Sequence, residues 1–126
     1  MAAVMRKILL VDDQPNFVKM LTVKLSKMGY EILSGGNGKE GLDLAIAEKP
    51  DLIMMDIMMP VMDGFAAAKE IRANAETVNI PIIFLSARGQ EEDRIRAEQL
   101  QAVDFFTKPF SPRAIVERIQ ELVPAT

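Results

Sequence analysis

The 126-residue sequence contains no cysteine and no histidine. The lack of cysteine excludes disulfides, thiol catalysis and a thiolate metal site, and it is compatible with a reducing cytosol. With 15 basic and 18 acidic residues the formal charge is −3, so a strongly basic face and direct nucleic-acid binding are not expected. The apolar runs are too short to span a bilayer, and the first residues lack the apolar core of a signal peptide. We therefore expect a cytoplasmic protein with no membrane segment.

Short apolar segments alternate with longer amphipathic segments along the chain. Strands are predicted over residues 7–11, 31–33, 52–55, 80–85 and 103–106. Several of these segments are continuous apolar runs, which suit a parallel sheet covered on both faces. The pattern predicts an α/β fold of (βα)5 type, a doubly wound five-stranded parallel sheet with helices on both faces. We expect one domain over residues 4–123, without an output domain.

The segments between the strands carry helix signals. Helices are expected over residues 15–28, 37–49, 63–73, 89–100 and 111–122. Asn37 and Glu40 have the spacing of a capping box, and Pro112 suits the first turn of the last helix. The segment 89–100 is highly charged and weakly amphipathic, which predicts that its helix is the least anchored of the five.

Polar side chains follow four of the predicted strands. Asp12 and Asp13 follow the first strand, Asp56 the third, Ser86 the fourth and Lys108 the fifth. Each residue alone is more often a helix cap, a turn former or a solvated side chain. However, ligands of open α/β sheets bind outside the carboxyl ends of the strands, and all of these residues fall at that edge. Their convergence predicts a functional site.

The residue types at this edge suit phosphoryl transfer. Crowded carboxylates raise each other's pKa, and a divalent cation relieves their repulsion. Because the available ligands are hard oxygens, Mg²⁺ is favoured over zinc. Asp56 can act as a nucleophile, while Lys108 and the Ser86 hydroxyl can stabilise the negative charge of a phosphoryl group.

The same residues resemble the receiver domain of bacterial response regulators, of the CheY-like type. The resemblance spans about residues 6–122 and rests on segments 8–13, 51–56, 59–60, 62–64, 86–87, 105 and 108–110. It implies a flavodoxin-like sheet of strand order 2-1-3-4-5, a two-component or phosphorelay function, and a cis Lys108–Pro109 bond. Gln101 stands where many relatives have the glycine that ends the fourth helix, so the length of that helix stays open.

The resemblance also implies a role for each residue of the site. Asp56 would be the phosphoacceptor. Mg²⁺, or Mn²⁺ in its place, would be ligated by Asp13, Asp56 and the main-chain carbonyl of Met58, with Asp12 acting mainly through water. Lys108 would pair with the phosphoryl group, and Ser86 and Phe105 would be the switch residues. Because family members vary at the positions of Met58 and Arg88, we hypothesise that these two residues tune the lifetime of the phosphate. Phosphorylation would draw Ser86 in, let Phe105 turn inward and change the surface of the fourth helix, fifth strand and fifth helix.

The implied phosphoryl donor is a sensor histidine kinase or a histidine phosphotransfer protein, and the implied output is binding to a protein target. A monomer is expected, with no enzymatic activity beyond phosphorylation and dephosphorylation of its own Asp56. A haloacid dehalogenase-type phosphatase would need an aspartate at Met58, and a flavin carrier would need a phosphate-cradling loop after the first strand. A degenerate receiver is the nearest alternative, although no acid, hydroxyl or lysine of the set is missing.

Two features have more than one interpretation. Phe105 could be an ordinary core aromatic. Methionines gather around Asp56, at positions 54, 55, 58, 59 and 62. A thioether copper site is conceivable there, but adaptable apolar packing is favoured.

Overall fold

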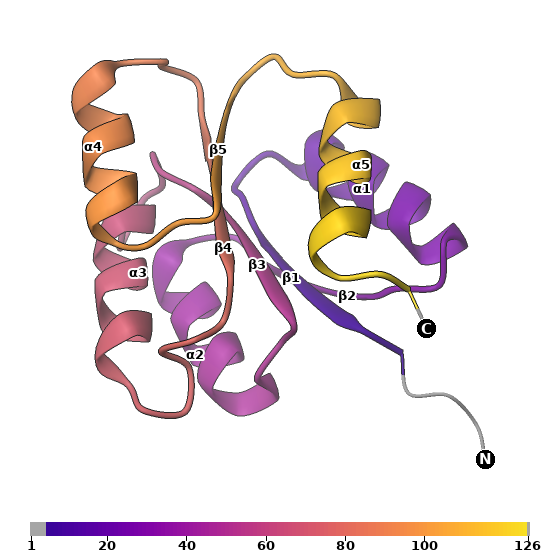
Figure 1. Cartoon of the computed structure of the whole chain (residues 1–126), viewed down its shortest axis with the longest axis horizontal. Helices are drawn as coiled ribbons and strands as arrows, with labels where there is room; N and C mark the ends of the chain where they lie inside the picture. The colour runs from indigo at the N-terminus through magenta and orange to yellow at the C-terminus, as the bar shows by residue number, and fades with distance from the viewer. Residues whose placement is uncertain (1–4, 126) are drawn as a thin grey trace.

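The computed structural model describes residues 5–125, so the predicted domain start at residue 4 lies outside the described part of the chain. Five strands alternate with five helices along it (Figure 1). In chain order they are β1 (Lys7–Val11), α1 (Pro15–Lys27), β2 (Glu31–Gly35), α2 (Gly38–Glu48), β3 (Leu52–Asp56), α3 (Gly64–Ala73), β4 (Ile82–Ser86), α4 (Glu91–Gln99), β5 (Asp104–Thr107) and α5 (Pro112–Leu122). None of the helices among the described residues is long and apolar enough to cross a membrane.

The strands form one parallel sheet of order β2-β1-β3-β4-β5, which confirms the predicted fold class and strand order. Several strand bounds differ from the prediction by one or two residues. β3 and β4 include Asp56 and Ser86 because main-chain pairing continues past the last apolar side chain. β4 begins at Ile82 rather than at residue 80, and Pro81 before it has no N–H to donate to a neighbouring strand.

The sheet buries a hydrophobic cluster on each face. One cluster lies between the sheet and helices α2, α3 and α4, and the other between the sheet and helices α1 and α5. Figure 1 shows this division, with α1 and α5 on one side of the strands and the other three helices opposite. The buried residues of β1, β3 and β4 alternate between the two clusters, which explains why these strands read as continuous apolar runs.

Tyr30 connects the segment before β2 to the residue after α5, within the hydrophobic cluster beneath α1 and α5. It is 1% exposed, and its hydroxyl donates a hydrogen bond of 2.6 Å to the main-chain oxygen of Val123. Burial raises the pKa of this phenol above its ordinary value. The bond fixes the end of α5 beside the start of β2.

α4 is the least apolar of the helices, as its sequence predicted. Its buried residues are Asp93 and Ala97. It ends cleanly although Gln101 replaces the usual glycine, because Gln101 adopts the left-handed conformation at φ 60°. The N–H groups of Gln101 and Ala102 then donate to the carbonyls of Glu98 and Ala97, which is a Schellman arrangement.

A guanidinium holds this helix end in place. Arg72 of α3 donates from Nε to the carbonyl of Leu100 at 2.9 Å and from Nη2 to that of Gln101 at 3.4 Å. Its Nη1 bonds the carbonyls of Val78 and Ile80 at 2.8 and 2.7 Å. One side chain therefore ties the end of α4 to the segment that leads into β4.

Four of the five methionines near Asp56 pack in or against the hydrophobic clusters. Met54 and Met55 are fully buried on opposite faces of the sheet, in different clusters. Met59 and Met62 pack against the cluster of Met55, whereas Met58 is 56% exposed. Since these thioethers lie on both faces of the sheet, packing explains them better than a shared copper site.

Candidate functional site

Three carboxylates meet at the carboxyl edge of the sheet. Asp12 and Asp13 follow β1, and Asp56 is the last residue of β3, the strand beside it. Each offers an oxygen that lies within 4.8 Å of the oxygens of the other two. Asp12 and Asp56 are buried and Asp13 is exposed, so the group opens to solvent on one side. The sequence prediction that these acids converge is confirmed.

The loop after β3 is shaped by a glycine. Gly64 donates its N–H to the carbonyl of Ile57 at 2.9 Å. A Cβ at Gly64 would lie 2.2 Å from the main-chain oxygen of Asp56, so a larger residue cannot take this position without a shift of the backbone. Asp63 before it caps α3 by accepting a hydrogen bond from the N–H of Ala66. These contacts fix where Asp56 lies relative to α3.

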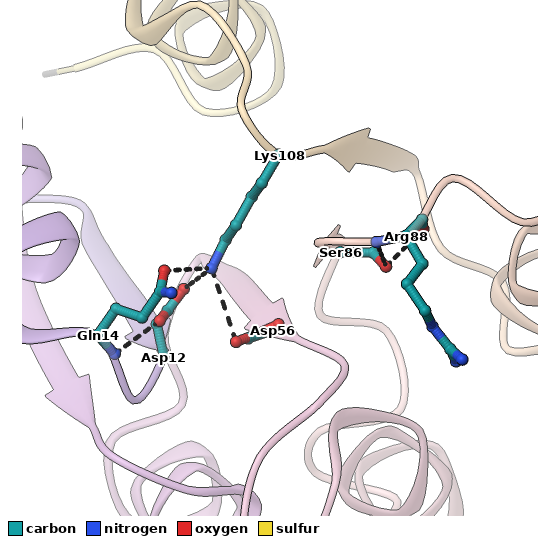
Figure 2. Close-up of polar contacts among 6 residues, drawn as sticks. All are labelled: Asp12, Gln14, Asp56, Ser86, Arg88 and Lys108. Atoms are coloured by element: carbon teal, nitrogen blue, oxygen red, sulfur yellow. Dashed lines mark hydrogen bonds and ion pairs between the residues drawn. The ribbon is translucent and has the colours of Figure 1, made fainter.

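Lys108 reaches into the acidic group from the loop after β5 (Figure 2). Its Nζ lies 2.7 Å from Oδ2 of Asp12 and 3.6 Å from Oδ2 of Asp56. It also donates to Oε1 of Gln14 at 3.1 Å and lies 4.8 Å from the ring centre of Phe17. The Lys108–Pro109 peptide is cis, as the resemblance implied.

Gln14 and Phe17 were not singled out in the sequence. Gln14 supports the site twice, since its N–H also donates to Oδ1 of Asp12 at 2.9 Å. The position of Gln14, directly after the acidic pair, was the only signal that could have identified it. Phe17 falls within the helix predicted over residues 15–28, and a helical pattern does not reveal a contact with a lysine from the far end of the chain.

The surroundings of Asp56 disfavour its charged form. Burial raises the pKa of Asp56 from an ordinary 3.8 to about 6. The charge of Lys108 opposes this rise, whereas the charges of Asp12 and Asp13 add to it and the N–H of Met58 lowers it. A divalent cation among the three carboxylates would offset both the burial and the mutual repulsion. The donor set of hard oxygens, open on the side of Asp13, fits Mg²⁺.

Ser86 lies at the same edge, but its hydroxyl points to its own loop. Its Oγ donates to the carbonyl of Arg88 at 2.6 Å and accepts from the N–H of Arg88 at 3.0 Å. Figure 2 shows both bonds, with the Arg88 side chain directed away from Lys108 and Asp56. The structure therefore places Ser86 at the same edge of the sheet, with its hydroxyl bonded to the Arg88 main chain.

Phe105 lies on β5, away from the carboxylates. It is partly buried against the cluster of α2, α3 and α4. The guanidinium carbon of Arg94 on α4 lies 4.9 Å from the centre of its ring. Phe105 therefore packs against the hydrophobic core on one hand and contacts helix α4 on the other.

Comparison with known proteins agrees with this geometry. The family model described as "Response regulator receiver domain" matches residues 8–120. The PilH protein of Pseudomonas aeruginosa is 38% identical over 119 residues, covering 94% of this chain and 98% of PilH. The chemotaxis protein CheY4 of Vibrio cholerae has a similar structure, with a TM-score of 0.88, 30% identity, and coverage of 95% of this chain and 100% of CheY4.

Another similar structure is the receiver domain of the sensor histidine kinase PA1611 from Pseudomonas aeruginosa, in which a magnesium ion is coordinated in the active-site cleft. It has a TM-score of 0.85 and 31% identity, and the match covers 94% of this chain and 98% of that domain. The chain spans only about half the length of other curated relatives, among them transcriptional regulators.

The family match favours a signalling receiver over the phosphatase and flavin-carrier alternatives, since receivers are not a classical enzyme family. The group of three aspartates is typical of a phosphorylation site in such a domain. The matched residues, the fold and the acidic site together show that the chain belongs to the response regulator receiver domains of two-component signalling.

Proposed function

We propose that this chain is a phosphorylation-activated switch in which Asp56 accepts a phosphoryl group from a phosphohistidine donor. The observation that carries the proposal is the convergence of the three carboxylates with Lys108, whose Nζ lies 3.6 Å from Asp56 Oδ2. Asp56 is the carboxylate at the end of the central strand β3. A single group of residues thus offers a nucleophile, a metal site and a cation.

In the proposed transfer, a carboxylate oxygen of Asp56 attacks the phosphorus atom. The P–N bond to the donor imidazole breaks, and the imidazole nitrogen keeps the electron pair. Lys108 would then pair with a phosphoryl oxygen, because its Nζ already lies 3.6 Å from Asp56 Oδ2 and has three hydrogens to donate. The transferring group spreads negative charge over its oxygens, so a lysine in this position stabilises it.

Mg²⁺ would be held by Asp13, Asp56 and the main-chain carbonyl of Met58, with Asp12 bonded mainly through water. When bound, the ion supplies a second positive charge beside the phosphoryl oxygens. Mn²⁺, which takes the same oxygen ligands, is the proposed substitute.

The proposed output begins at Ser86. Its hydroxyl would turn to a phosphoryl oxygen, and Phe105 would turn into the space that is released. The partial burial of Phe105 and its contact with Arg94 support a change on the surface formed by α4, β5 and α5. That surface would bind a downstream protein target.

Met58 is proposed to shield the acyl phosphate from water, because its side chain is 56% exposed and lies two residues after Asp56. Arg88 is the second residue proposed to tune this lifetime. Met58→Asn is expected to speed dephosphorylation by making the approach to Asp56 more polar. The decay of the phosphorylated protein, followed by intact mass, measures this, and an unchanged rate would show that Met58 is no shield.

The central test uses Mg²⁺ and acetyl phosphate as a small phosphoryl donor. Wild-type protein is expected to gain one phosphoryl group, seen by mass spectrometry as an acid-stable, base-labile adduct. Asp56→Asn should not gain it. Asp63→Asn is the matched control, because Asp63 lies in the same loop but caps α3, a role that asparagine also fills. No adduct on wild type, or an equal adduct on Asp56→Asn, would falsify the proposal.

The phosphoryl donor would be a sensor histidine kinase or a histidine phosphotransfer protein. The functional unit would be the domain of residues 4–123, a monomer with a cytoplasmic location that binds neither nucleic acid nor membrane directly. Its chemistry would be limited to phosphorylation and dephosphorylation of its own Asp56.

A further inference from the structure

The loop between β4 and α4 is held by the Ser86 hydroxyl. Ser86 is fully buried, and its Oγ closes a pair of hydrogen bonds with the carbonyl and the N–H of Arg88. A serine hydroxyl has one hydrogen to donate. It therefore cannot donate to a phosphoryl oxygen on Asp56 and keep its 2.6 Å bond to the Arg88 carbonyl.

The side chain of the same arginine reaches α4. Nη2 of Arg88 lies 3.5 Å from Oδ2 of Asp93, whose side chain is 6% exposed in the first turn of the helix. In the part of the chain that the structure describes, the N-cap residue Gln90 makes no side-chain capping bond. The ion pair with Arg88 is thus a direct side-chain contact between this first turn and the loop.

The rest of α4 has little apolar contact that could keep the helix in place without this pair. Ala97 is its buried apolar residue. Two further arginines of α4 lie over aromatic rings, Arg94 over Phe105 at 4.9 Å and Arg96 over Phe65 at 4.3 Å. Such contacts are weaker than the burial of a large apolar side chain. A change at the first turn can therefore shift the whole helix.

We infer that Arg88 is a positioning residue that transmits the state of the Ser86 hydroxyl to the first turn of α4 through its ion pair with Asp93. When Ser86 donates to the phosphoryl group, the Arg88 carbonyl loses the hydrogen bond that it accepts from this hydroxyl. The loop relaxes, the guanidinium moves from Asp93, and the start of α4 loosens. This inference rests on the proposed phosphorylation of Asp56 for its trigger, but the connection from Ser86 to α4 exists without phosphate and is testable without it.

The test is a double-mutant cycle read by amide hydrogen exchange over residues 92–97, in protein without a phosphoryl donor. Ser86→Ala removes the hydroxyl, and Arg88→Met removes the ion pair while keeping the length of the side chain. Each change alone is expected to speed exchange in the first turns of α4 roughly fivefold, the scale of a partly exposed ion pair. Together they should speed it little more than either alone, since both interrupt one connection.

Further variants separate transmission from general destabilisation. Ser86→Thr keeps a hydroxyl and should keep the wild-type exchange rates, and Asp93→Asn should behave as Arg88→Met does. Arg113→Met is the matched control, because it removes an exposed arginine ion pair with Glu117 on α5, far in the sequence from this loop. Multiplicative effects of Ser86→Ala and Arg88→Met, or unchanged exchange in either variant, would overturn the inference.

A second readout links this connection to the trigger. Saturating beryllofluoride with Mg²⁺ should speed α4 exchange in wild type but change it little in Arg88→Met. An equal response in both would overturn the role of Arg88 and leave the phosphorylation of Asp56 intact. Conversely, failure of wild type to form the acetyl phosphate adduct would contradict the proposed function, while the double-mutant cycle would still decide the connection from Ser86 to α4.

Discussion

Helices α4 and α5 flank the last strand, β5, on opposite faces of the sheet, and different interactions hold them there. α5 inserts Ile115 and Ile119, both fully buried, into the cluster that it shares with α1. α4 buries Ala97, and its other described contacts include those of three arginines. Arg88 pairs with its first turn, Arg96 lies over Phe65, and Arg72 bonds the carbonyl at its end. Apolar burial is non-directional and large, whereas ion pairs and cation–π contacts are small and depend on geometry. The comparison indicates that α5 is the fixed side of β5 and α4 the side that can move.

The largest effect is expected from shortening a buried side chain of α5. Ile119→Ala is expected to lower the free energy of unfolding by about 3 kcal/mol, because the site is fully buried and the lost side chain leaves a cavity. Urea unfolding followed by far-ultraviolet circular dichroism measures this loss. A loss below about 1 kcal/mol would mean that α5 is not the fixed side.

The acidic group at the sheet edge is expected to act against stability in metal-free protein. The pKa of Asp56 is raised from 3.8 to about 6, so the fold favours its protonated form. The stability that this carboxyl contributes is complete below about pH 4 and is lost as the pH rises through about 6. At pH 7.5 in chelator, Asp56→Asn should therefore be more stable than wild type by about 2–3 kcal/mol.

Urea unfolding at pH 4.5 and pH 7.5 tests this, since the advantage of Asp56→Asn should shrink strongly at the lower pH. Mg²⁺ should stabilise wild type more than Asp56→Asn. An advantage of equal size at both pH values would show that the carboxylate charge is not its cause. A change in stability that depends on pH would come from the charge of Asp56, and not from the packing of α4 or α5.

The end of α4 is expected to depend on Arg72 of α3. Arg72→Met should cost about 2 kcal/mol, since it leaves carbonyls of Val78, Ile80 and Leu100 without this donor. The loss should be concentrated in the exchange of amides 97–102, in contrast with the global loss in Ile119→Ala. Equal protection of these amides in wild type and variant would remove Arg72 from the anchoring of α4.

The smallest effect is expected within α4 itself. Arg96→Met removes the guanidinium that lies 4.3 Å from the ring centre of Phe65, at an expected cost of about 1 kcal/mol or less. Arg96→Lys should keep part of that contact. A cost near that of Ile119→Ala would erase the difference between the two helices and with it the reason for α4 to move.

The order of elements, the parallel sheet and the approach of the acids could be predicted because they depend on patterns of apolar and polar residues along the chain. The weak anchoring of α4 was predictable for the same reason. The strand order and the cis peptide came from resemblance to a family rather than from the pattern.

Contacts made by long side chains could not be predicted. The bonds of Arg72, the pairing of Arg88 with Asp93 and the contact of Lys108 with Gln14 depend on rotamers and on distances between separate elements. The left-handed Gln101 was also missed, because glycine is the residue usually found in that conformation. The guanidinium of Arg72 supports this turn, because it donates to the carbonyls of Leu100 and of Gln101 itself.

The buried bond between Tyr30 and Val123 has a practical consequence. The sequence has a single tyrosine and no tryptophan, so one phenol dominates the near-ultraviolet emission of the whole protein. The hydroxyl of that phenol donates a hydrogen bond to the carbonyl of Val123, directly after α5. Undocking of this helix would expose the phenol to water and change its light emission, so the protein carries an intrinsic optical reporter that needs no label. The same signal should stay constant while α4 moves, which would allow the two helices to be followed separately in one sample.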